Sequence, residues 1–107
     1  MDYYMCHQEL VADTPLYFCK IVKDTWPRPI IVGIFHAYFL HIHHQASGGH
    51  LEMHRVLSSP YFDYLASPFS YEYDARFPGG SGHFRCLTET VRHYGKLWMS
   101  EVDHPTH

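Results

Sequence analysis

The feature of this sequence that most restricts its fold is a nearly unbroken apolar run from Ile30 to Leu40. β-Branched and aromatic residues dominate the run, so both faces of an extended chain would be apolar. Such strands are typical of parallel sheets, whose two faces are both covered, whereas half-exposed strands alternate apolar with polar residues. The run is too short to cross a bilayer as a helix, which takes about 20 residues. The sequence therefore predicts a buried strand of a parallel sheet and no membrane span.

Helical and extended patterns alternate along the rest of the chain. Apolar residues at helical spacing predict a helix from Gln8 to Trp26. Pro15 marks either the start of that helix, with Thr14 as its N-cap, or a kink within it. Further patterns predict a helix at 50–58, a strand at 62–67, a loop at 68–84, a helix at 87–94 closed by Gly95, and a strand at 96–100. This order predicts an α/β fold in which about three parallel strands alternate with helices.

Composition limits the function classes that remain. The chain has 107 residues, 46% hydrophobic and 18% charged, which predicts one folded domain rather than a disordered segment. Its net charge of −3 gives no sign of a nucleic-acid-binding surface. Cys6, Cys19 and Cys86 are odd in number and lack C-x-x-C spacing, and no signal peptide is recognisable, so we expect a reducing, cytoplasmic location.

Polar and aromatic residues gather where the predicted strands end. Three histidines, His41, His43 and His44, follow the first strand, Ser70 and Tyr71 follow the second, and Glu101 follows the third. Ligands of α/β folds bind outside the carboxyl ends of the strands. A carboxylate just past an apolar strand can act as a nucleophile or a general base, so Glu101 is the leading catalytic candidate.

The loop after the second strand and the eleven histidines are the other candidates for chemistry. Tyr71 and Arg76 could form the rim of a sugar site, because aromatic rings stack on sugars and guanidinium groups donate to hydroxyls. The glycines at 79, 80 and 82 do not form a phosphate-binding motif, and no G-x-S-x-G serine motif occurs. The histidines, with His50 and His54 among them, fit surface and rim positions better than a zinc site, so we predict no metal and no cofactor.

Four stretches of the chain, in order, resemble motifs of the β-galactosidase-like glycoside hydrolases of family 42 and their relatives. They are Val32–Tyr38 (VGIFHAY), Ser47–Pro60 (SGGHLEMHRVLSSP), Asp63–Tyr71 (DYLASPFSY) and Leu87–Asp103 (LTETVRHYGKLWMSEVD). The resemblance runs from about residue 8 to the end. It departs from the family pattern at His36-Ala37, where the family has Tyr-Gly, and at Pro105, where it has Arg.

The resemblance implies that residues 1–107 form one partial catalytic domain, with strands 5 to 7 of a (β/α)8 barrel. It implies that Glu101 is the nucleophile of a retaining β-galactosidase-like enzyme and that the acid/base glutamate would precede Met1. The isolated chain is then expected to be inactive. The implied partner is a carbohydrate, with no nucleic acid or membrane, and exposed sheet edges would favour homo-oligomers or aggregation. The residues expected to bind substrate are Tyr38, Tyr71, Arg76, Trp98 and Asp103.

The sequence is also compatible with two other hypotheses about function. One is a catalytically silent carbohydrate-binding remnant that keeps the aromatic rim. The other is a histidine-dependent metal enzyme of barrel type.

Overall fold

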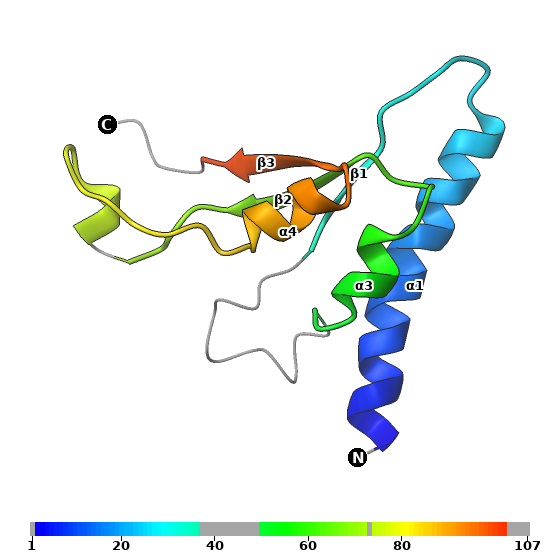
Figure 1. Cartoon of the computed structure of the whole chain (residues 1–107), viewed down its shortest axis with the longest axis horizontal. Helices are drawn as coiled ribbons and strands as arrows, with labels where there is room; N and C mark the ends of the chain where they lie inside the picture. Colours follow the sequence, from blue (N-terminus) through cyan, green and yellow to red (C-terminus); the bar gives the residue numbers. More distant parts are fainter. Residues whose placement is uncertain (1, 37–49, 73, 103–107) are drawn as a thin grey trace.

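The computed structural model describes residues 2–36, 50–72 and 74–102. These residues form three strands that alternate with helices, as the sequence predicts (Figure 1). The elements are α1 (Asp2–Thr25), β1 (Gly33–Phe35), α3 (Met53–Leu57), β2 (Tyr64–Pro68), the 3₁₀ helix η1 (Asp74–Arg76), α4 (Thr88–His93) and β3 (Leu97–Glu101). The end of the apolar run, residues 37–40, and residues 41–49 lie outside the described residues.

Helix α1 begins six residues earlier than predicted and continues through Pro15. Proline removes one backbone hydrogen bond from a helix interior, yet the turns on both sides stay helical here. Gln8, Ala12 and Cys19 form the buried side of α1. Of the two alternatives for Pro15, the longer helix is therefore the correct one.

The three strands form one parallel sheet in the order β1-β2-β3. One row of the register is Ile34, Leu65 and Trp98, and the next row is Phe35, Ala66 and Met99. Side chains alternate along each strand, so these two rows point to opposite faces of the sheet.

The helices cover one of these two faces. Ile34 and Leu65 belong to the buried core, and Trp98 packs against it. Figure 1 shows α3 alongside α1, with α4 beside the sheet. We call this side of the sheet the helix face. The helices contribute the remaining core residues, which include Ala12, Cys19, Val56, Leu57 and Val91.

The opposite side, which we call the open face, carries Phe35, Ala66, Leu97, Met99 and Glu101. The Phe35, Leu97 and Met99 side chains are 56%, 58% and 52% exposed. The prediction that the strand from Ile30 to Leu40 is buried on both faces is thus wrong for its described part. The strand buried on both faces is β2, where Leu65, Ala66, Ser67 and Pro68 are buried in succession, because β2 is the middle strand.

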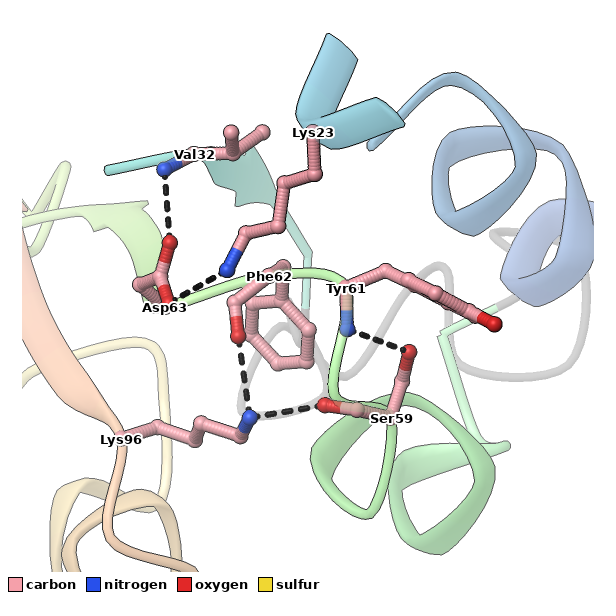
Figure 2. A network of polar contacts seen from close by, with 7 residues as sticks. All are labelled: Lys23, Val32, Ser59, Tyr61, Phe62, Asp63 and Lys96. Atoms are coloured by element: carbon pink, nitrogen blue, oxygen red, sulfur yellow. Dashed lines mark hydrogen bonds and ion pairs between the residues drawn. The ribbon is translucent and has the colours of Figure 1, made fainter. Parts of the chain in front are cut away.

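Polar contacts tie the amino ends of the three strands together (Figure 2). The Asp63 carboxylate accepts hydrogen bonds from the Val32 backbone N–H at 2.9 Å and from Lys23 Nζ at 2.7 Å. The Lys96 ammonium donates to the backbone carbonyls of Ser59 at 2.7 Å and Phe62 at 2.9 Å. These contacts join the residues just before β1, β2 and β3, and so fix the starting points of the strands.

Burial alone would raise the pKa of Asp63, but the hydrogen bonds from Lys23 and from Val32 outweigh it. The pKa of this carboxyl therefore lies below its usual value. The pKa of Lys96 is lowered, first by burial and then by the charge of Lys23, against the opposing charge of Asp63. The Asp63 carboxyl is thus ionised at neutral pH.

Candidate functional site

The candidate site lies at the carboxyl ends of the strands, opposite the polar network. Glu101 is the last residue of β3, in register with Pro68, and its side chain is exposed. Its backbone carbonyl accepts a hydrogen bond from the Phe69 N–H at 3.2 Å, so the chain leaving β2 stays beside the end of β3. The open face of the sheet therefore presents a carboxylate at its carboxyl edge.

The segment after β2 folds back on the sheet through aromatic contacts. Phe69 pairs with Phe84 in an isolated antiparallel bridge, and their ring centroids are 5.8 Å apart. The Phe84 ring also packs edge-on against Trp98, with centroids 4.5 Å apart. These contacts hold both ends of the predicted Gly-rich loop near the ends of β2 and β3.

Two arginines flank one tyrosine in this segment. The Arg76 guanidinium lies 4.7 Å, and that of Arg85 3.9 Å, from the centroid of the Tyr71 ring. Tyr71 is 40% exposed, whereas Arg85 is buried. The guanidinium groups lie over the ring and take up aromatic face, whereas the exposed Tyr71 and Arg76 side chains can hydrogen-bond to sugar hydroxyls.

The structure brings together only some of the predicted site residues. Tyr71 and Arg76 are in contact. Trp98 lies on the helix face, where its indole N–H donates to Ser67 Oγ at 3.1 Å, so it points away from the face that carries Glu101. Tyr38 and Asp103 lie outside the described residues.

Two residues of this region, Phe84 and Arg85, are not among the residues predicted from the sequence to form the site. Phe84 joins the rings of Phe69 and Trp98, and Arg85 stacks on Tyr71. The available signal was an aromatic-basic pair directly after a Gly-rich loop, but nothing in that pair predicts a buried arginine.

The described histidines do not converge on a metal site. Within residues 2–36, 50–72 and 74–102, no three His, Cys, Asp or Glu side chains are placed to hold a metal ion. His54 Nδ1 lies 2.8 Å from the Tyr94 hydroxyl, while His50 packs against His36. The cluster at 41–44 lies outside the described residues. The described cysteines are free thiols, exposed at Cys6 and buried at Cys19 and Cys86.

Comparison of the chain with protein-family models, with curated proteins and with solved structures finds no match. Among the described helices, none combines the length and the apolar character needed to cross a membrane. The described part of the structure is a small α/β unit with a three-stranded parallel sheet, which is consistent with part of a barrel.

Proposed function

We propose that this chain is the part of a retaining, β-galactosidase-like glycoside hydrolase barrel that carries the nucleophile, and that Glu101 is this nucleophile. The observation that supports the proposal best is the position of Glu101, at the carboxyl end of β3 on the open face. In a (β/α)8 barrel, helices cover the outside of the sheet and the other face lines the interior. Catalytic groups of such barrels sit at the carboxyl ends of strands.

Two exposed apolar surfaces agree with a larger barrel. The open face exposes Phe35, Leu97 and Met99, side chains that would fill the interior of a closed sheet. Helix α1, next to β1 in the chain, exposes Leu10 and Tyr17, which are 60% and 62% accessible. Further strands and helices packed beyond β1 would cover both surfaces.

The chemistry follows from two carboxyl groups. In a retaining glycosidase, one carboxylate attacks the anomeric carbon and a second carboxyl, about 5 Å away, protonates the leaving group and then activates water. Glu101 would supply the first group, and the remaining strands of the barrel would supply the second. Tyr71 and Arg76 would hold the sugar at the rim, with Arg85 supporting the Tyr71 ring. We place this activity in the cytoplasm, on the cysteine pattern.

The test supplies the missing strands. The chain replaces strands 5 to 7 in the barrel of a family 42 relative, and hydrolysis of an aryl β-galactoside is measured. Glu101→Ala is expected to lower kcat by about 10³-fold or more, because it removes the attacking group from the transition state. Glu89→Ala, which changes an exposed glutamate of α4, is the matched control and should leave kcat unchanged. Equal rates for the two variants would refute the assignment.

The Tyr71 rim also supports a second candidate, a carbohydrate-binding remnant without catalysis. It predicts that the chimeric barrel binds galactosides with wild-type affinity and shows no turnover that depends on Glu101. Tyr71→Ala would weaken binding in either case, so the dependence of kcat on Glu101 is what separates the two functions.

A further inference from the structure

Two histidine rings are in contact on the helix face, where α1, β1 and the approach to α3 meet. His36, directly after β1, is 1% exposed, and its Nε2 atom has no hydrogen-bond partner. The His50 ring lies against it, with centroids 4.7 Å apart and planes tilted by 59°. Buried polar atoms normally have a partner, so the unpaired Nε2 is an exception that calls for a physical explanation.

The same junction attaches the approach to α3 to helix α1. The Leu51 N–H, next to His50, donates to the side-chain oxygen of Gln8 at 2.9 Å. Gln8 lies on the buried side of α1. Two residues later α3 begins, and its Val56 and Leu57 side chains are in the core. The histidine contact and the Gln8 hydrogen bond therefore hold α3 in place together.

The groups around the two rings do not stabilise a positive charge. Burial, and to a lesser extent the neighbouring His50, lower the pKa of His36 to about 4. Burial also lowers the pKa of His50, with an added contribution from His7 of α1. Strands β2 and β3 place Ser67 and Ser100 on the same face, and neither titrates. Burial and a neighbouring histidine are the causes of both pKa shifts.

We propose that His36 and His50 form an acid-sensitive contact that keeps residues 50–52 and α3 docked on α1 and β1 at neutral pH and releases them on protonation. A proton on either ring places a cation in a buried site beside another histidine. Separation of the rings lets water solvate that charge. This inference is independent of the proposed glycosidase activity.

The direction of the pH effect follows from linkage. The released state has the ordinary histidine pKa of 6.5, and the docked state holds His36 near 4. The docked state therefore binds fewer protons, so docking is strongest above pH 6.5 and weakens as the pH falls toward 4. For one such group, the docking equilibrium constant falls about 30-fold between pH 7.5 and pH 5.

The experiment is amide hydrogen exchange on the full chain, followed by NMR and corrected for the intrinsic pH dependence of exchange. The Leu51 and Val56 amides report on docking of this segment, and the Leu97 amide, bonded to the Asp63 carbonyl, reports on the sheet. We expect protection at Leu51 and Val56 to fall about 30-fold from pH 7.5 to pH 5, and protection at Leu97 to change by less than about threefold. Constant protection at Leu51, or an equal fall at all three amides, overturns the proposal.

The variant test uses a matched pair of substitutions. His36→Phe keeps a ring of similar size and cannot be protonated, so the part of the pH dependence at Leu51 that comes from His36 should disappear, leaving only the smaller contribution of His50. His93→Phe changes an exposed histidine of α4 and should leave the pH dependence intact. If His36→Phe retains the wild-type pH dependence, the proposal is wrong. Because the wild-type measurement decides the question alone, the test holds even if His36→Phe fails to fold.

Discussion

Asp63 is the residue of the polar network whose substitution tests the fold most sharply (Figure 2). Asp63→Ala removes two bonds at once, the one from the Val32 N–H and the one from Lys23 Nζ. A hydrogen bond to a charged group contributes about 1.5–3 kcal/mol. The Lys23 and Asp63 side chains are 25% and 34% exposed, so solvent reduces the ion pair to about 0.5–1 kcal/mol. We therefore expect Asp63→Ala to lower the free energy of unfolding by about 2–4 kcal/mol.

Two further variants separate these contributions. Asp63→Asn keeps an acceptor for the Val32 N–H and should cost about 1 kcal/mol, and Lys23→Met should cost no more than the ion pair. Urea unfolding at pH 7 measures all three. The reasoning fails if Asp63→Asn is as destabilising as Asp63→Ala, or if Lys23→Met costs more than either.

The acid range gives an independent check on Asp63. Its pKa is lowered in the folded chain relative to the ordinary value of 3.8. The folded state thus binds protons less readily, so the stabilisation is complete well above pH 3.8 and is lost as the pH falls below it. The penalty of Asp63→Ala should accordingly shrink in acid. A penalty that stays constant down to pH 2 would contradict the charge-based account.

Three further outcomes follow from the structure. Lys96→Met should lower the unfolding free energy in urea titrations by about 2–4 kcal/mol, because the carbonyls of Ser59 and Phe62 lose a charged donor; a loss under about 0.5 kcal/mol would refute this. The double variant Phe35→Thr/Met99→Gln should shift sedimentation profiles from oligomer toward monomer, because it removes apolar area from the open face; unchanged association would assign self-association to another surface. Trp98→Phe should cost about 1 kcal/mol in thermal or urea unfolding through loss of the bond to Ser67, and no cost would show that this bond contributes nothing.

The order of elements and the parallel sheet were predictable from the sequence, because the local spacing of apolar residues indicates each helix and strand. The periodicity of α1 and the helix-ending Gly95, which adopts a φ of 69°, are of this kind. Strand burial was not predictable in the same way, because it depends on position in the sheet. A central strand, β2, is covered on both faces, whereas the more apolar run around β1 leaves Phe35 exposed.

The candidate site was predictable in part. The position of Glu101 at a strand end follows from the strand pattern, and Tyr71 and Arg76 follow from the composition of the loop. The side of the sheet to which Trp98 points depends on register, which local patterns fix poorly, because a shift of one residue reverses every side chain. Phe84, Arg85 and His36 make contacts with residues distant in the sequence, and no local sequence pattern indicates such contacts.

The central claim, that Glu101 is the nucleophile, is tested most directly by chemical rescue in the chimeric barrel. Sodium azide is added to the Glu101→Ala variant with an activated aryl β-galactoside, and the configuration of the product is determined by NMR. If Glu101 is the nucleophile, azide occupies the vacated space and attacks the anomeric carbon once, which gives the inverted α-galactosyl azide. A β-galactosyl azide would assign Glu101 to the acid/base position, and the absence of rescue with retained wild-type turnover would remove it from the reaction.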